Sequence, residues 1–439
     1  MVENLPIWDL SDYYKDINDP QIDKDIEELK QLSETFNNKV KGKLKDELFT
    51  FDQLQQWLKE YEQIGEGTFY LETYSQLLYR IMSLDDEIKA FRSKIEQFTV
   101  NIQENLMFFF LELNEISKEK YEELIQTSEL NTYKHVIEFN RLEKAHQLTE
   151  KEEQIILMKD ITGVNGFRKL YREIKSGFTY EFEIDGELKE LTAADLYAML
   201  YTKDKDVRYN ALKTYLTKYK ENGMVFTHIL INVLKDWDLE TKKKGFKTPI
   251  SRKNLLNEVS DESVEILGRV TTESYHIVEK YYNLKRKILG LTELHISDLY
   301  APVGQLNMRY TFNESLELIK TVDRTFYPEF EEIIDRMIDK NHVDAKPRKG
   351  KVRGAFCAHG KMKHYPFVYV NFANDLDSVL TLAHELGHAF HAYYMQQEQN
   401  YINGHDISLV VAEIASVFNE ILVYDHFVNS NISNARKVI

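Results

Sequence analysis

The sequence predicts a mainly α-helical protein made of many helices, and three observations support this prediction. The 439 residues include only 7 Pro and 17 Gly, too few for the frequent turns of an all-β fold. Apolar residues in the first half recur three or four positions apart with charged residues between them, as in amphipathic helices. Hydrophobic residues make up 43% of the chain, which is enough for a large core.

The first expected helix covers residues 20–40, because Asp19-Pro20 is a typical helix start. Its apolar stripe consists of Ile22, Ile26, Leu29, Leu32 and Phe36. The same spacing predicts further helices over 52–63, 68–95 and 97–127.

A β-hairpin is expected to interrupt the helices at 178–191. Aromatic or β-branched residues alternate with polar ones in 178–184, and Asp185-Gly186 then precedes a second short strand. Thr192 is the expected N-cap of a helix over 193–200. We take the hairpin as the boundary between an N-terminal helical lobe, 1–177, and a second lobe, 178–439.

The composition excludes several classes of partner. Subtracting 72 Asp and Glu from 56 Lys and Arg leaves a net charge of −16, so the chain repels nucleic acid. A basic segment at 346–354 is interpreted as a loop packed near an acidic centre. No apolar run reaches the ~18 residues of a membrane span, and the N-terminus lacks the features of a signal peptide. The single cysteine, Cys357, leaves no intrachain disulfide, so we expect a cytoplasmic protein.

Residues 384–388 read His-Glu-Leu-Gly-His within an expected helix over 377–397, which follows an expected edge strand, 366–372. On a helix His384 and His388 lie about 40° apart and one turn along, so both imidazoles can bind one cation. Glu385 lies about 100° from His384, where it can reach a water held on the metal. Two nitrogen ligands, an open position and a carboxylate base are typical of a zinc hydrolase.

A catalytic zinc ion needs a third protein ligand, and Glu413 is the candidate. It interrupts an apolar stretch in a second expected helix, over 406–420, where burying a lone carboxylate would be costly. A bound cation would offset that cost; the alternative is an ion pair with an Arg or Lys elsewhere. A turn at 403–405 would let the two helices meet antiparallel.

Further polar residues share these helix faces. His391 follows His384 by seven residues, and Glu420 follows Glu413 by seven, so each is about 20° off the same stripe. Glu420 is expected to accept a hydrogen bond from a ligand histidine or from His391, or else to be a surface carboxylate. His405, in the connecting turn, is expected either to face the cleft or to be structural.

The motif at 384–391, followed by Glu413, Ser416 and Glu420, resembles the thimet-type family of zinc oligopeptidases, and more closely its oligoendopeptidase F branch. Further similar stretches lie at 7–14, 298–302, 354–357 and 366–372. The resemblance implies a two-lobed, largely helical ellipsoid with a deep channel for short peptides and a small antiparallel β element beside the zinc helix.

The resemblance also implies roles for individual residues. Glu385 would be the general base that activates a zinc-bound water. The ligands of one Zn²⁺ per chain would be His384, His388 and Glu413. The strand 366–372 would border the site and pair with the substrate backbone. The residues that make this pairing would be Val368, Tyr369 and Val370.

Family members usually continue well beyond the Glu-x-x-Ser segment, into a region whose His and Tyr side chains donate hydrogen bonds to the substrate carbonyl. This chain ends at Ile439 and has no match to that cluster. We therefore expect a zinc-binding catalytic lobe that is truncated at its C-terminus. Losing one oxyanion donor typically costs ~10²–10³ in rate. The chain alone would be weakly active or inactive, with a missing C-terminal fragment or another copy covering its site.

The sequence thus predicts a zinc-dependent endopeptidase that hydrolyses internal bonds of short peptides. Two alternatives stay open. A helical zinc carboxypeptidase would use the same motif but remove single residues from the C-terminus of its substrate. A non-catalytic protein would hold zinc or peptides without hydrolysis.

Overall fold

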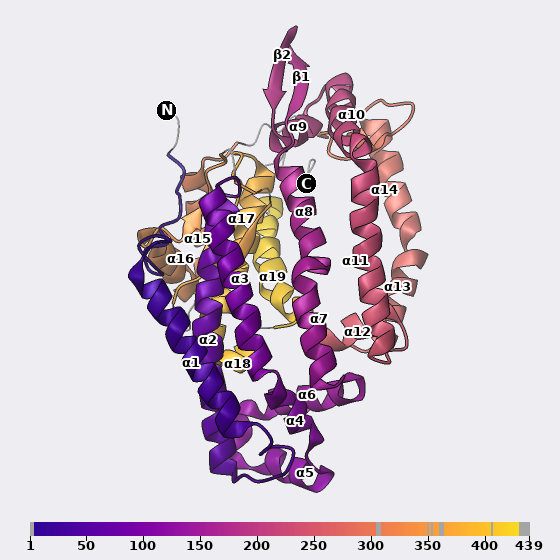
Figure 1. Ribbon diagram of the computed structural model, residues 1–439. Coiled ribbons are helices and arrows are strands. Elements are labelled where there is room, and N and C mark those ends of the chain that lie inside the picture. The colour runs from indigo at the N-terminus through magenta and orange to yellow at the C-terminus, as the bar shows by residue number, and fades with distance from the viewer. Residues whose placement is uncertain are drawn as a thin grey trace. The chain divides into compact units, whose positions relative to one another are not determined.

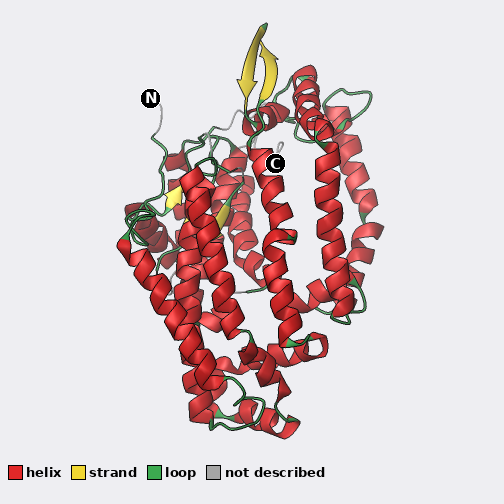
Figure 2. Cartoon of the chain, viewed as in Figure 1, coloured by secondary structure: helices red, strands yellow, loops and turns green. Residues whose placement is uncertain are grey.

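The computed structural model describes residues 4–303, 309–348, 351–352, 354–359, 364–404 and 407–429. Helices dominate this part of the chain, and its strands form two small sheets (Figure 2). The expected mainly α class is therefore confirmed. None of the described helices is both long and apolar enough to cross a membrane.

The chain divides into two compact units. The first unit comprises 1–160 and 309–424, and the second comprises 161–308 and 425–439. These units are discontinuous in sequence, whereas the expected lobes, 1–177 and 178–439, are continuous. The lobe boundary stays a prediction.

The helices of the first unit come from both halves of the sequence (Figure 1). Those before residue 160 are α1 (Pro20–Val40), α2 (Phe51–Ile81), α3 (Asp86–Leu106), α4 (Phe108–Glu115), α5 (Lys118–Gln126), α6 (Lys134–Glu143) and most of α7 (Glu150–Thr162). Those after residue 309 are α15 (Phe312–Phe326), α16 (Glu329–Asp339), α17 (Leu376–Glu398), α18 (Tyr401–Gly404) and most of α19 (Leu409–Asn429). Short 3₁₀ turns lie at Ser128–Tyr133 and Lys144–His146.

Local capping explains where the first helices begin. The Asp19 side chain accepts a hydrogen bond from the Gln21 amide at 3.0 Å, so α1 starts where the sequence predicts.

The predicted break between 63 and 68 is wrong, because α2 continues through both of its glycines. A Cβ at Gly67 would lie 2.7 Å from the Leu29 side chain, so this glycine permits close packing of α1 on α2.

A three-stranded sheet lies beside α17 in the first unit. Its order is β3 (Val343–Asp344), β5 (Phe367–Tyr369), β4 (Phe356–Ala358). The sheet is mixed, because β3 pairs with β5 in parallel and β4 pairs with β5 antiparallel. The expected edge strand is therefore the central strand. Pro366 is tolerated because it precedes the first paired residue and removes no hydrogen bond from the ladder.

The second unit contains the predicted hairpin. Strands β1 (Tyr180–Ile184) and β2 (Glu187–Leu191) pair antiparallel, with Ile184 opposite Glu187. Asp185 and Gly186 adopt φ values of 55° and 80°, the conformation of a two-residue type I′ turn. The Thr192 side chain caps α9 (Ala193–Ala198), which gives way to a 3₁₀ turn, Met199–Tyr201, instead of continuing to residue 200.

The remaining helices of the second unit are α8 (Val164–Ser176), α10 (Lys205–Glu221), α11 (Gly223–Lys243), α12 (Pro249–Leu256), α13 (Asp261–Glu273) and α14 (Tyr275–Ile288). A buried ion pair fixes α10 to the 3₁₀ turn Ile296–Asp298: Arg208 Nη2 lies 2.7 Å from Asp298 Oδ1. Both side chains are almost fully buried, so neither charge could be removed alone without leaving the other unpaired.

Candidate metal centre

Helix α17 positions the two histidines of the predicted motif. The Asp375 side chain accepts a hydrogen bond from the Ser378 amide at 2.8 Å and starts the helix one residue before the predicted position. Buried residues such as Leu382 and Leu386 hold its apolar side in the core. His384 and His388 therefore lie together on the other side, with their ring centroids 4.9 Å apart and each side chain about a fifth to a quarter exposed.

Helix α19 brings the carboxylate of Glu413 to both imidazoles. Glu413 Oε2 lies 3.2 Å from His384 Nε2 and 3.5 Å from His388 Nε2. One potential ligand atom of each residue lies within 4.8 Å of the other two. Ligands 2.0–2.2 Å from a tetrahedral zinc ion are about 3.4 Å apart. The three side chains therefore fit a zinc ion.

The two helices are held in register by close backbone contact. A Cβ at Gly387 would lie only 2.5 Å from the Ala415 carbonyl oxygen, so only glycine allows this approach. Asn419 Nδ2 donates a hydrogen bond of 2.8 Å to the carbonyl oxygen of Ala383. Residues 383, 387 and 388 of α17 contact residues 419, 415 and 413 of α19 in that order, so the helices run antiparallel as predicted.

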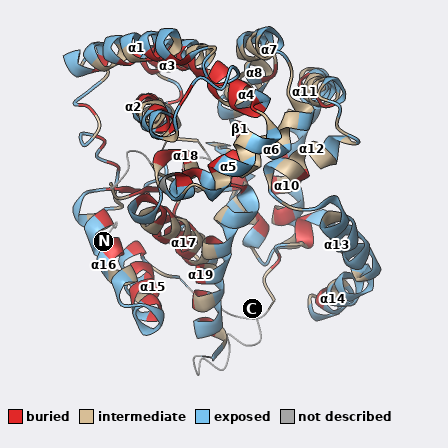
Figure 3. Ribbon diagram, turned by 90° about the horizontal axis from the view of Figure 1, so that it is seen from below, coloured by how far each residue is buried: buried red, intermediate tan, exposed pale blue. Residues whose placement is uncertain are grey.

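The carboxylate of Glu413 is oriented from its own helix. Ser416 Oγ donates to Glu413 Oε2 at 2.7 Å and also contacts the Glu413 carbonyl at 3.0 Å. The Glu413 side chain is 47% exposed, so the expectation that it is buried is wrong. The apolar residues around it are exposed as well (Figure 3). They are Leu409, Val410, Val411, Ile414, Val417 and Phe418.

Glu385 points into the core beside the two histidines. The residue is only 5% exposed, and among the described residues its Oε2 has no hydrogen-bond partner. Burial, with a smaller contribution from the Glu413 charge, raises the pKa of Glu385 to about 8. Burial also lowers the pKa of His388, against the opposing effect of Glu413, and a lower pKa favours the neutral imidazole that a metal requires.

Glu420 contacts the first histidine of the motif. Its Oε2 lies 3.0 Å from His384 Nδ1. A carboxylate only accepts, so Nδ1 carries the proton and Nε2 keeps its lone pair for a metal. Among the described residues His391 makes no hydrogen bond or ion pair with Glu420. His405 lies outside the described residues.

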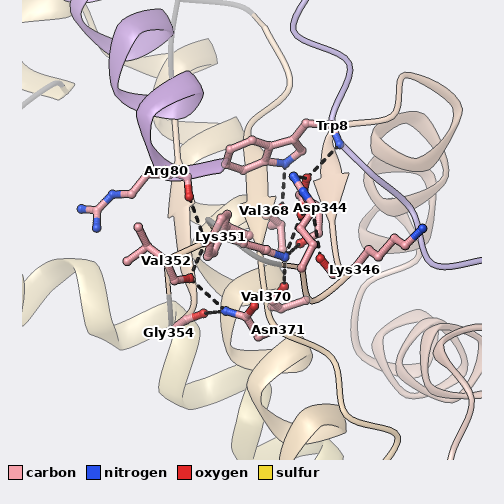
Figure 4. A network of polar contacts seen from close by, with 12 residues as sticks. Trp8, Arg80, Asp344, Lys346, Lys351, Val352, Gly354, Val368, Val370 and Asn371 are labelled. Atoms are coloured by element: carbon pink, nitrogen blue, oxygen red, sulfur yellow. Dashed lines mark hydrogen bonds and ion pairs between the residues drawn. The ribbon is translucent and has the colours of Figure 1, made fainter. Parts of the chain in front are cut away.

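A buried polar network sets the small sheet beside α17 (Figure 4). Lys351 Nζ lies 2.7 Å from Asp344 Oδ1, and both side chains are 0% exposed. Arg348 pairs with the same carboxylate at 2.8 Å. The neighbouring positive charges lower the pKa of Asp344, although its burial opposes them. The basic segment therefore packs on an acidic residue, as interpreted from the sequence.

The same network uses polar backbone groups of β5 and of Val370, the residue that follows it. The Val368 amide donates to the His342 carbonyl at 2.9 Å, and its own carbonyl accepts from Trp8 Nε1 at 2.9 Å. The Val370 carbonyl accepts from Lys351 Nζ at 2.5 Å. Tyr369 is paired with Phe356 of β4. These groups already have partners within the chain, and the pairing of Val368, Tyr369 and Val370 with substrate stays a prediction.

The sequence patterns gave no role to three residues that shape this site. Gly387, Ser416 and Asn419 set the approach of the helices and the orientation of the carboxylate. A glycine inside a strongly predicted helix and an asparagine in an apolar one are the patterns that point to two of them. Neither pattern identifies the contact partner, because the partner lies on the other helix.

Two family models match the sequence. The model described as peptidase family M3 matches residues 198–438, which include the whole candidate centre, and the model described as Oligopeptidase F matches residues 112–180. The chain belongs to peptidase family M3. The resemblance to this family and to its oligoendopeptidase F branch is thereby confirmed.

The relatives of this M3 member carry related names. Oligopeptidase PepF of Bacillus subtilis is 26% identical over 429 residues, which cover 96% of this chain and 62% of the relative. Group B oligopeptidase PepB of Streptococcus agalactiae is 26% identical over 335 residues, which cover 76% of this chain and 55% of the relative. The chain thus spans about three-fifths of the length of these relatives.

Solved structures share the helical fold of this M3 member. Oligoendopeptidase-F from Enterococcus faecium superposes with a TM-score of 0.66 at 19% identity, covering 94% of this chain and 68% of that one. A structure of PZ peptidase A superposes with a TM-score of 0.69 at 18% identity, covering 95% and 70%. At this level of identity the likeness concerns the fold.

Proposed function

We propose that this M3 member is a zinc-dependent oligoendopeptidase that hydrolyses internal bonds of short peptides. The observation that carries the proposal is the convergence of His384, His388 and Glu413 on a volume that a tetrahedral cation would fill. The names of its relatives, oligopeptidase and oligoendopeptidase, support the same class of substrate.

The zinc ion would be held by His384, His388 and Glu413. When bound, zinc lowers the pKa of a coordinated water and polarises a carbonyl oxygen. Glu385 then serves as the general base. A cation beside Glu413 offsets the negative charge that helps to raise the pKa of Glu385 and so favours the carboxylate that accepts the proton.

Glu385 also returns that proton. Its buried position keeps bulk water from the carboxyl group, so an accepted proton can pass to the leaving amine of the peptide. Cys357 does not compete as a nucleophile, because burial and the Glu385 charge raise the pKa of its thiol and keep it neutral. A single neutral thiol is compatible with a reducing cytoplasm as the place of action.

The substitution Glu385→Gln tests this mechanism. We expect the variant to keep one zinc ion per chain, measured by elemental analysis, and to lose at least ~10²-fold in the cleavage of an internally quenched peptide. Glu398→Gln is the matched control, because Glu398 is an exposed carboxylate on the same helix. Cleavage by Glu385→Gln at the wild-type rate would refute the assigned base.

A peptide with a blocked C-terminus separates the alternatives. An endopeptidase cleaves it internally, whereas a zinc carboxypeptidase leaves it intact. The assay is run with and without a polypeptide that corresponds to the unmatched part of the relatives, and we expect the chain alone to be weakly active or inactive. One zinc ion per chain with no hydrolysis under either condition would favour a non-catalytic zinc protein.

A further inference from the structure

Two buried polar side chains lie behind the histidine pair, where α15, α17 and α19 meet. Asp323 of α15 is 0% exposed and Asn419 of α19 is 1% exposed. Asn419 donates to the Ala383 carbonyl of α17 at 2.8 Å. The next residues on these two helices, His384 and Glu420, also contact each other. Asn419 therefore sits one residue away from the contact that orients the first histidine.

Asp323 is a buried acid that the packing alone does not explain. Burial raises the pKa of Asp323 to about 7. The Asn419 side chain, which the carboxyl group faces, has a smaller effect that lowers this pKa. Within the described part of the chain, neither Asp323 oxygen nor Asn419 Oδ1 makes a hydrogen bond of good geometry. An unsatisfied buried polar group lowers the stability of the fold, and an apolar side chain at this position would avoid that cost.

The surrounding contacts show that α15 meets α19 at this point. The ring of Phe326, one turn along from Asp323, packs against Phe418 with the centroids 4.9 Å apart. A proton on the Asp323 carboxyl group would give this group a hydrogen-bond donor. The Asn419 side chain, which it faces, offers Oδ1 as an acceptor that has no partner among the described residues. That bond would leave the Asn419 amide nitrogen directed at Ala383.

We propose that Asp323 is a positioning residue for the metal centre: it orients Asn419, whose amide ties α19 to the Ala383 carbonyl. The inference rests on the proposed function, because Asp323 would set the position of Glu413 relative to the two histidines. A shift of one residue along a helix moves side chains by about 1.5 Å. Metal–ligand distances tolerate only about 0.2 Å, so a small change in register is enough to weaken the centre.

Cobalt binding by two variants of Asp323 tests the proposal. Asp323→Asn keeps a donor and an acceptor without charge, whereas Asp323→Leu has a similar size and neither. We expect Asp323→Asn to bind Co²⁺ like the wild type, with the same visible absorption. Asp323→Leu should bind it about tenfold more weakly with an altered spectrum, although its melting temperature is equal or higher. Wild-type affinity and spectrum in Asp323→Leu would overturn the proposal.

A second variant keeps the test decisive if Asp323→Leu fails to fold. Asn419→Ala breaks the same chain of bonds at its other end, so it should weaken Co²⁺ binding to the same extent. Unchanged Co²⁺ affinity in Asn419→Ala would overturn the proposal.

The readouts separate this inference from the proposed function. A chain that binds Co²⁺ but cleaves no peptide refutes the hydrolase, while the Co²⁺ comparison still decides the role of Asp323. A wild-type chain that binds no Co²⁺ refutes the metal centre. In that case the imidazole NMR signals of His384 and His388 in the metal-free protein decide: Asp323→Leu should shift them and Asp323→Asn should not. Unshifted signals in Asp323→Leu would overturn the positioning role.

Discussion

Replacing Gly387 with alanine should disrupt the candidate centre without touching any of its ligands. The added Cβ would lie 2.5 Å from the Ala415 carbonyl oxygen and 2.7 Å from Ser416 Cα. Both are backbone atoms of α19, so no side-chain rotation can relieve the overlap. The helices must therefore move apart where they hold the ligands.

The size of this displacement follows from ordinary contact distances. A carbon and a carbonyl oxygen approach to about 3.3–3.6 Å, so α17 and α19 must separate by roughly 0.8 Å or more. The His388 to Glu413 distance, now 3.5 Å, would then rise to about 4.3 Å, well above the ~3.4 Å between two ligands of a tetrahedral zinc ion. We expect zinc affinity to fall about tenfold or more.

Global stability should change much less than zinc affinity. Alanine is favoured over glycine inside a helix by about 1 kcal/mol, whereas overpacking costs about 1–3 kcal/mol. The free energy of unfolding of Gly387→Ala should therefore fall by at most about 2 kcal/mol. Urea unfolding measures this free energy, and competition with a chromophoric chelator measures zinc affinity.

Gly268→Ala is the matched control. Gly268 lies inside α13, and an added Cβ there would meet no atom of the described residues within 4 Å, so only the propensity gain applies. We expect stability to rise by up to about 1 kcal/mol with zinc affinity unchanged. Wild-type zinc affinity in Gly387→Ala would refute the claim that this close approach sets the ligand geometry.

Three further predictions concern other polar groups. Glu420→Gln should weaken zinc binding about 10–100-fold, because the carboxylate that holds the proton on His384 is lost; chelator competition measures it. The pKa of Asp323, about 7 against an ordinary 3.8, means that the folded state holds this proton more tightly and loses stability as pH rises from about 4 to 7. Urea unfolding of Asp323→Asn should show a gain over the wild type that grows across this range, to at most about 4 kcal/mol. Arg208→Met should lower the free energy of unfolding of its unit by about 3–5 kcal/mol, because Asp298 is left charged and buried, whereas an unchanged urea midpoint would contradict this.

Features that depend on neighbouring residues were predictable from the sequence. The start of α1, the turn at Asp185-Gly186 and the start of α17 follow from caps and turn residues within a few positions. The pairing of His384 with His388 follows from helix geometry alone. The sequence contains all of this information locally.

Features that depend on distant contacts were not predictable in this way. Nothing near Phe367–Tyr369 indicates that two other strands enclose it, since β3 and β4 come from a loop-rich region before it. The glycines of α2 look like a break until the Leu29 side chain is seen against one of them. Both errors arise because packing partners far along the chain override local propensity.

The assignment of Glu413 rests on one physical argument in the sequence and on a different one in the structure. The sequence suggested a carboxylate whose burial would need a cation, yet its side chain is 47% exposed and hydrogen-bonded to Ser416. A carboxylate that is half exposed is still solvated, so it has little desolvation cost for a cation to offset. Burial therefore does not explain why Glu413 is the candidate for the third ligand. What selects it is distance, because a donor about 3.4 Å from both imidazole nitrogens completes a tetrahedral set. The geometry in turn depends on Gly387 and on the Asn419 contact, so the residues that define this centre include ones that carry no ligand atom.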